Sequence, residues 1–200
     1  MKYHVPEKLN HDLTAAAIVD SNALPWTPSP LSGVERRFLE RDGGEVARAT
    51  SIVRYAPGSA FSPHVHDKGE EYLVLSGVFS DENGDFAEGT YVRYPPGSRH
   101  GPFTRDGCVI FVKLRQMADS EREARIVRTG DVEALPTGID GLSRIALHGG
   151  KSGEQVSIDM LEPGAQWRYR GRTSGEEILV LHGSLLYGDR RCEAGTWLRF

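Results

Sequence analysis

The second half of the chain repeats the first half. Residues 51–94 align without a gap with residues 157–200, and 14 of the 44 aligned pairs are identical. The identities include glycines at expected turns, namely Gly58 with Gly164, Gly77 with Gly183 and Gly89 with Gly195. Chance does not produce such agreement in register with the turns, and self-similarity of this kind indicates repeated structural units. The chain is therefore predicted to contain two homologous units in tandem.

Short runs of β-branched, aromatic and other apolar residues predict an all-β fold. Gly and Pro, which number 23 and 11, separate these runs. Strands at regular spacing with turn signals between them are typical of a barrel or sandwich. Little helix is expected, apart from a short helical connector at Ala118–Arg125. The predicted strands lie at 49–55, 71–80, 90–95, 108–114, 155–161, 176–187 and 196–200.

The repeat also predicts how the chain divides. The segment Ala23–Gly33 contains three prolines, so it is expected to form an extended arm on the barrel, anchored by Trp26, and not a central strand. The predicted parts are an N-terminal extended arm at 1–34, a first unit at 35–118 and a second unit at 119–200.

Composition and charge exclude several classes of function. The chain has 24 Lys+Arg against 28 Asp+Glu, a net charge of −4, and no basic run that would follow a phosphate backbone, so nucleic acid is not expected as a partner. The first residues lack the apolar core of a signal peptide, and no stretch reaches membrane-spanning length. A cytoplasmic protein without membrane contact is expected. Cys108 and Cys192 form no pairing motif, and both are predicted to be buried small apolar residues.

Four residues of the first unit are candidate metal ligands. His64 and His66 are two apart, so on a strand they share one face, and Glu70 keeps the same parity if that strand continues past a small irregularity at Lys68–Gly69. His100 follows a tight Pro-Pro-Gly turn that would bring it from a neighbouring strand to the same interior. An isolated histidine is more often a hydrogen-bonded core or surface residue. The combination of three imidazoles and one carboxylate favours a divalent metal with open coordination positions.

These residues lie in two motifs that resemble those of cupins. GSAFSPHVHDKGEEYLVLSG at residues 58–77 is similar to the first cupin motif, and GTYVRYPPGSRH at residues 89–100 is similar to the second. The resemblance implies an antiparallel jelly-roll barrel in each unit, hence a bicupin. It also implies one transition metal bound by His64, His66, Glu70 and His100, with Zn or Fe expected and Mn or Ni as alternatives. Thr104 departs from the family pattern, because an Asn that is not a metal ligand commonly ends the second motif.

A longer stretch, Trp26–Met117, resembles the cupin domain of ChrR-type anti-sigma factors. The resemblance implies a metal-binding cupin that responds to oxidative stress such as singlet oxygen. In that family a helical domain with a His-and-CxxC zinc motif precedes the cupin and holds the sigma factor. That zinc motif is absent from this sequence, so direct binding of a sigma factor is not expected.

The second unit keeps the scaffold but loses the ligands. His64 and His66 align with Arg170 and Arg172, whereas Glu70 aligns with Glu176. Guanidinium groups stay protonated and cannot ligate a cation, so one metal per chain is expected. Arg170, Arg172 and Glu176 are interpreted as an ion-pair cluster filling the vacated site, with an anion-binding pocket as the alternative. The second unit is expected to be truncated or to close differently after Phe200.

Two classes of function fit this pattern. The first is a regulatory binding module that responds to an oxidant or a small ligand at the metal. The second is a mononuclear non-haem Fe(II) dioxygenase that cleaves a small carbonyl or dicarbonyl substrate. The sequence does not separate the two, because the fold does not determine function, and a homodimer is compatible with either.

Overall fold

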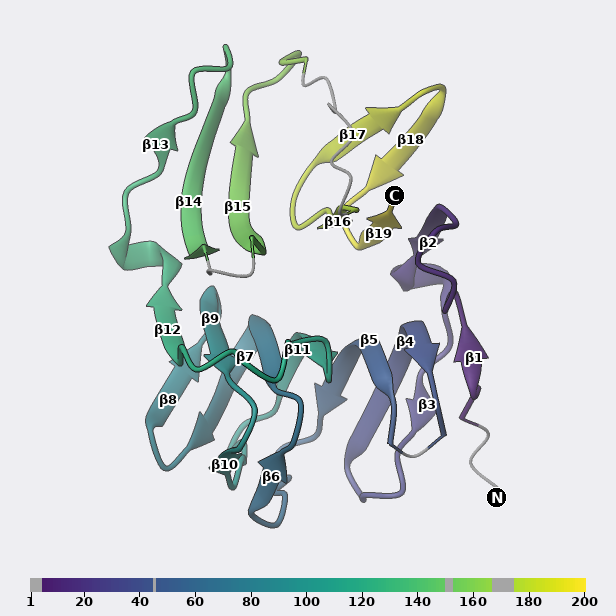
Figure 1. Cartoon of the computed structure of the whole chain (residues 1–200), viewed down its shortest axis with the longest axis vertical. Coiled ribbons are helices and arrows are strands. Elements are labelled where there is room, and N and C mark those ends of the chain that lie inside the picture. The colour runs from purple at the N-terminus through teal and green to yellow at the C-terminus, as the bar shows by residue number, and fades with distance from the viewer. Residues whose placement is uncertain (1–4, 45, 150–152, 167–174) are drawn as a thin grey trace.

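The chain forms two lobes made almost entirely of β-strands (Figure 1). The computed structural model describes residues 5–44, 46–149, 153–166 and 175–200. Helical turns in these residues are confined to two 3-10 helices, η1 (Ser21–Ala23) and η2 (Thr129–Asp131). The predicted all-β fold is therefore confirmed. No helix in the described part of the chain is long and apolar enough to cross a membrane.

The first unit contains the largest sheet, which has nine antiparallel strands. These are β1 (Lys8–Leu9), β3 (Thr27–Pro28), β4 (Val34–Asp42), β5 (Arg48–Tyr55), β7 (Glu70–Asp81), β8 (Gly84–Ala87), β9 (Thr90–Tyr94), β11 (Cys108–Leu114) and β12 (Arg125–Arg128). Seven strands follow the order β1-β4-β5-β11-β7-β9-β12, while β3 pairs with β4 and β8 pairs with β7. The predicted strands in this unit are confirmed.

The remaining strands form four smaller sheets. In the first unit, β6 (His64–His66) pairs with β10 (Ser98–His100). The other three sheets lie in the upper lobe of Figure 1. They comprise β13 (Leu135–Pro136), β14 (Leu142–Gly149) and β15 (Gln155–Leu161); β16 (Glu177–Leu179), β19 (Thr196–Arg199) and β2 (Ala17–Asp20); and β17 (Ser184–Tyr187) with β18 (Arg190–Glu193).

The two units exchange strands with each other. Strand β2 precedes the first unit in the chain, yet it pairs with β19 of the second unit. Strand β12 is the first strand of the second unit, yet it pairs with β9 of the first unit. Strands β9 and β19 are equivalent in the repeat. Each unit therefore uses the same strand to pair with a strand from the other part of the chain. The sequence repeat does not reveal this exchange, since it aligns equivalent strands but says nothing about their partners.

Apolar side chains join the two units. Trp197 on β19 is fully buried against Leu39 and Ile52 on the outer face of the large sheet. A second junction brings Tyr91 of β9 together with Ile145 and Leu147 of β14. Burial of an aromatic side chain of this size contributes several kcal/mol, so we expect the units to stabilise each other. The interior of the first barrel forms a separate core that includes Tyr72, Val74, Phe79, Phe86, Val92 and Ile110.

The proline-rich arm lies where the sequence predicts. Thr27 and Pro28 pair with one edge of β4, a position that tolerates proline because the edge needs fewer backbone donors. Trp26 packs against the Trp197 cluster, and the guanidinium groups of Arg37 and Arg54 lie 4.2 and 4.4 Å from its ring centroid. These contacts attach the segment around Trp26 to the large sheet.

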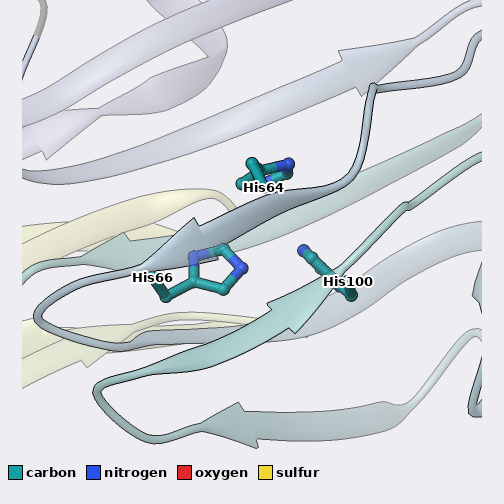
Figure 2. Close-up of side chains that lie close together, drawn as sticks. All are labelled: His64, His66 and His100. Carbon is teal, nitrogen blue, oxygen red and sulfur yellow. The ribbon is translucent and has the colours of Figure 1, made fainter.

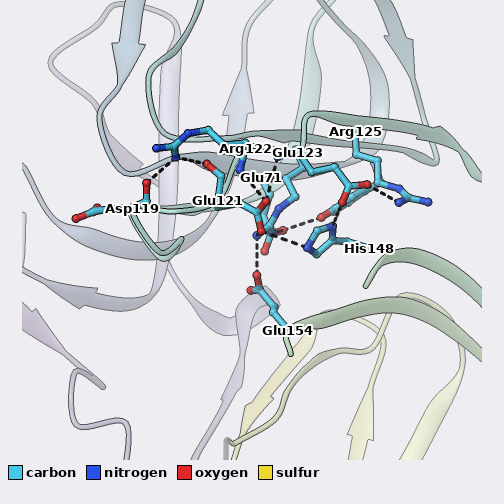
Figure 3. Close-up of polar contacts among 10 residues, drawn as sticks. Glu71, Asp119, Glu121, Arg122, Glu123, Arg125, His148 and Glu154 are labelled. Carbon is cyan, nitrogen blue, oxygen red and sulfur yellow. Dashed lines mark hydrogen bonds and ion pairs between the residues drawn. The ribbon is translucent and has the colours of Figure 1, made fainter. Parts of the chain in front are cut away.

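A buried polar cluster crosses the junction between the units (Figure 3). Arg93 on β9, whose side chain is 1% exposed, donates hydrogen bonds of 2.7 Å to Glu71 of β7 and to Glu154 of the second unit. The Tyr91 hydroxyl also donates to Glu71 at 2.7 Å. His148 of β14 lies 3.7 Å from Glu121 in the segment that connects the units. The cluster therefore contains side chains from both units and from the connector.

The predicted helix at Ala118–Arg125 is wrong. The segment forms a turn, closed by a hydrogen bond from the backbone N–H of Glu121 to the carbonyl of Ala118, and continues as extended chain. One carboxylate oxygen of Glu121 accepts hydrogen bonds from the backbone N–H groups of Arg122 and Glu123, and the other lies 3.6 Å from Arg93. These local and tertiary contacts replace helical hydrogen bonds, which a segment of this length cannot maintain without packing.

Candidate metal centre

Strands β6 and β10 bring three histidines together (Figure 2). In their antiparallel register His100 lies opposite His64, and Ser98 lies opposite His66. Alternation along each strand directs His64, His66 and His100 to one face, while Val65 and Arg99 face the other way. The ring centroids are 4.7 to 5.1 Å apart. The predicted convergence of these three residues is therefore observed.

The Pro95-Pro96-Gly97 turn delivers His100 as predicted. Gly97 has a φ of +88°, which favours glycine, and the N–H of Ser98 donates to the carbonyl of Pro95. The N–H of Gly97 donates to the carbonyl of His66 at 2.8 Å. This bond ties the turn to the end of β6, so the two histidine-bearing strands are held at one end.

Glu70 reaches the centre by a route different from the predicted one. The strand that carries His66 does not continue to Glu70, because a turn at Asp67–Lys68 ends it and Glu70 begins β7 in the large sheet. Gly69 closes this turn with a φ of +77°. A Cβ at Gly69 would lie 2.4 Å from the Sδ of Met117, so no larger residue fits without a rearrangement. The turn redirects the chain, and this places the Glu70 carboxylate beside the imidazoles.

The side-chain atoms in the centre have the geometry of metal ligands. The ligand atoms of the three histidines lie within 4.8 Å of one another. One carboxylate oxygen of Glu70 is 3.4 Å from Nε2 of His66 and 3.2 Å from Nε2 of His100. These three atoms are buried and have no hydrogen-bond partner. Because an unsatisfied buried polar atom costs about 1–3 kcal/mol, three of them facing one point fit a bound cation.

Further hydrogen bonds orient two of the imidazoles. Nδ1 of His64 lies 3.0 Å from the carbonyl of Ser62, and Nδ1 of His100 lies 3.0 Å from the Asp81 carboxylate. With Nδ1 donating in each case, Nε2 is free to ligate a metal. Sequence reasoning missed Asp81, because it lies in SDENGD, a stretch that resembles an exposed hairpin turn. Its spacing from the histidines carries no signal that would have identified it.

The electrostatics of the centre favour a cation. Burial acts to raise the pKa of Glu70, but His100, whose Nε2 lies 3.2 Å away, and the charges of His66 and His64 outweigh it, so the pKa is lowered. Burial also acts to lower the pKa of His100, but Asp81 and Glu70 outweigh it and raise the pKa to about 9. Burial lowers the pKa of His66. Glu70 therefore presents a carboxylate to the three imidazoles.

Thr104 has a structural role where the cupin motif commonly has Asn. Its hydroxyl donates to the carbonyl of Val78 at 2.7 Å and accepts from the N–H of Gly107 at 3.1 Å. Its backbone N–H donates to the carbonyl of Ser59. Thr104 thus holds the loop before β11, and none of these three hydrogen bonds involves a histidine of the centre.

The equivalent positions in the second unit are described only in part. Arg170 and Arg172 lie outside the described residues. Glu176 precedes β16, and its backbone exchanges two hydrogen bonds with Phe200. Cys108 and Cys192 are free and buried, as predicted.

Comparison with known proteins identifies the family. The family model of the ChrR cupin-like domain matches residues 14–118. A candidate dioxygenase from Nostoc punctiforme has a similar structure, with a TM-score of 0.71 and 14% sequence identity, covering 98% of this chain and 75% of that chain. Protein Ylba from E. coli gives a TM-score of 0.57 and 14% identity, covering 98% of this chain and 86% of that chain.

A third similar structure is the complex of Rhodobacter sphaeroides SigE with the anti-sigma ChrR, with a TM-score of 0.40 and 25% identity over 46% of this chain and 50% of that chain. No curated protein matches the chain. The family match spans more than half of the sequence and includes the three histidines and Glu70. The chain therefore belongs to the family of ChrR cupin-like domains.

Proposed function

We propose that the chain is a regulatory module that binds one divalent transition metal and responds to a small ligand or an oxidant at that metal. The proposed ligands are His64, His66, Glu70 and His100. The observation that carries the proposal is the set of three buried, unpartnered atoms on His66, Glu70 and His100, which point to one position beside His64. The family match supports the regulatory role, since it is to the ChrR cupin-like domain.

The donor set leaves room for a ligand. Three neutral imidazoles and one carboxylate occupy four positions, and Zn or Fe are the expected metals, with Mn or Ni as alternatives. When bound, such a metal supplies a Lewis-acidic position at which a small molecule can coordinate. His64 is the most exposed of the three histidines, so a ligand would enter on its side. Tyr94 is buried beside the centre, with its ring centroid 5.0 Å from that of His100.

A mononuclear Fe(II) dioxygenase is the second candidate. Three histidines and one glutamate with open positions suit Fe(II) that binds O2 and a chelating carbonyl compound together. The likeness to the candidate dioxygenase extends over 98% of this chain and so over both units, although it concerns the fold alone at 14% identity.

Metal analysis of the purified chain tests the proposed centre. We expect one equivalent of metal in the wild type and none in His66→Ala or Glu70→Gln, with the barrel still folded by circular dichroism. His182→Ala, which changes an exposed histidine of the second unit, is the matched control and should keep the metal. Metal retained in His66→Ala would contradict the assignment. Two equivalents that persist when His64 and His66 are both replaced would contradict the expectation of a single site.

Oxygen consumption separates the two candidates. The Fe(II)-loaded chain is mixed with small diketones, and O2 uptake is followed with an electrode. Uptake that depends on the diketone and is lost in His66→Ala would favour the dioxygenase. A regulatory module should show no turnover, and an oxidant such as hydrogen peroxide should instead change its metal content or its conformation.

A further inference from the structure

Asp81 links the proposed metal centre to a buried hydrogen-bond network. It is the last residue of β7, and its side chain is 1% exposed. One carboxylate oxygen accepts from Nδ1 of His100 at 3.0 Å and from the Tyr94 hydroxyl at 2.6 Å. The other accepts from the backbone N–H of Asn83 at 2.6 Å. The Asn83 amide also donates to the Tyr94 hydroxyl at 3.0 Å, so the Asp81 side chain is held from three directions.

This network restricts the orientation of His100. A hydrogen bond from Nδ1 to a fixed carboxylate selects the tautomer with Nε2 unprotonated and prevents rotation of the ring. Nε2 of His100 then faces the Glu70 carboxylate, 3.2 Å away. Asp81 therefore acts on the centre through His100, without contact with the metal position.

Asp81 also adds a second negative charge to the centre. Among the described residues, Glu70 and Asp81 contact histidines, Tyr94 and Asn83, and none of these partners is a lysine or an arginine. Two carboxylates would therefore offset the charge of a divalent cation held by His64, His66, Glu70 and His100. A loaded centre with neutral imidazoles has no net charge. An anionic ligand would bring an unbalanced charge into the barrel, which is costly away from water.

We propose that Asp81 is a positioning residue which fixes His100 for the metal and, together with Glu70, makes the loaded centre neutral, so that it favours uncharged ligands over anions. The inference rests on the proposed function, because it assumes a metal at His64, His66, Glu70 and His100. The favoured class contains molecules such as O2 and hydrogen peroxide. Carboxylates and enolised diketones belong to the disfavoured class.

The test uses Co(II) as the metal probe and azide as the anion probe. The visible absorption of Co(II) reports metal binding, and its change on titration with azide reports the anion. Asp81→Asn removes the charge but keeps an oxygen that can accept from His100. We expect this variant to bind Co(II) about 10-fold to 100-fold more weakly. It should bind azide about tenfold more tightly than the wild type does, because a nearby negative charge is gone.

Weaker Co(II) binding combined with tighter azide binding distinguishes this role of Asp81 from a simple loss of structure. A variant that only loosens the barrel would bind both the metal and azide less well. Glu82→Gln is the matched control: Glu82 adjoins Asp81 and accepts from the N–H of Gly101, but it is exposed. Its charge is screened by water and salt, so both affinities should stay within about twofold. If Asp81→Asn does not fold, Asp81→Ser, which keeps a hydroxyl that can accept from His100 but carries no charge, provides the second test, again with weaker Co(II) binding and tighter azide binding expected.

Each result has a definite meaning. Failure of the wild type to bind Co(II) would contradict the proposed function itself. One equivalent of Co(II) in the wild type and in Asp81→Asn, with azide affinity unchanged or weaker in the variant, would overturn only the inference about Asp81. Tighter azide binding in Glu82→Gln, equal to that in Asp81→Asn, would also overturn it, because the effect would then be general surface charge.

Discussion

Replacement of Arg93 by methionine should destabilise the protein strongly, although Arg93 is not among the proposed metal ligands. The Arg93 side chain is 1% exposed, and the Glu71 side chain to which it donates at 2.7 Å is 6% exposed. Methionine fills a similar volume but cannot donate to Glu71, which then keeps the hydrogen bond from the neutral Tyr91 hydroxyl without its cationic partner. Breaking a buried ion pair in this way costs about 3–5 kcal/mol. Glu154 is 34% exposed, so it can turn towards water and adds little.

Urea denaturation of Arg93→Met measures this effect. The free energy of unfolding should fall by about 3–5 kcal/mol. The melting temperature should fall by roughly 6–20 °C, since each kcal/mol corresponds to roughly 2–4 °C for a chain of this size. The double variant Arg93→Met with Glu71→Gln should recover part of the loss, because no unpaired charge remains. Arg191→Met, at an ion pair more than half exposed on both sides, is the control and should change stability by less than about 1 kcal/mol. A loss below about 1 kcal/mol in Arg93→Met would refute the reasoning.

Three other predictions concern the turn at Gly69, the bound metal and the buried Cys108 thiol. Gly69→Ala should lower the free energy of unfolding by about 2–5 kcal/mol, because alanine is strained at the left-handed φ and its Cβ overlaps Met117. Gly97→Ala should lower it by only about 1–2 kcal/mol, because Gly97 has a φ of +88° but no atom within 4 Å of an added Cβ. Equal losses in urea denaturation would contradict this. Metal at about 1,000 times its Kd should raise stability by about 4 kcal/mol in thermal denaturation, and the increase should disappear with a chelator or in His66→Ala. Burial raises the pKa of the Cys108 thiol to about 11, so at pH 8 about one thousandth is thiolate, and this thiol should react with a disulfide reagent only after unfolding.

The repeat and the strand pattern allowed much of the fold to be predicted. Alternating apolar residues and turn glycines are local signals, so the strands that carry Tyr72, Val92 and Ile110 could be located before the structure was known. The convergence of His64, His66 and His100 followed from strand parity and one tight turn, which are also local. The helix expected at Ala118–Arg125 failed because its charged residues make tertiary contacts that propensity does not include.

The sequence by itself determined that the chain is an all-β tandem repeat with candidate metal ligands in its first half, because periodicity and spacing act over a few residues. Only the tertiary structure decided that a turn at Asp67–Lys68 redirects Glu70 into the centre, that Asp81 holds His100, and that β2 and β12 cross between the units. The Arg93 cluster is also a tertiary feature, since it joins residues 61 positions apart. Such contacts depend on how sheets pack across long sequence separations, and the burial that makes them strong exists only in the folded chain.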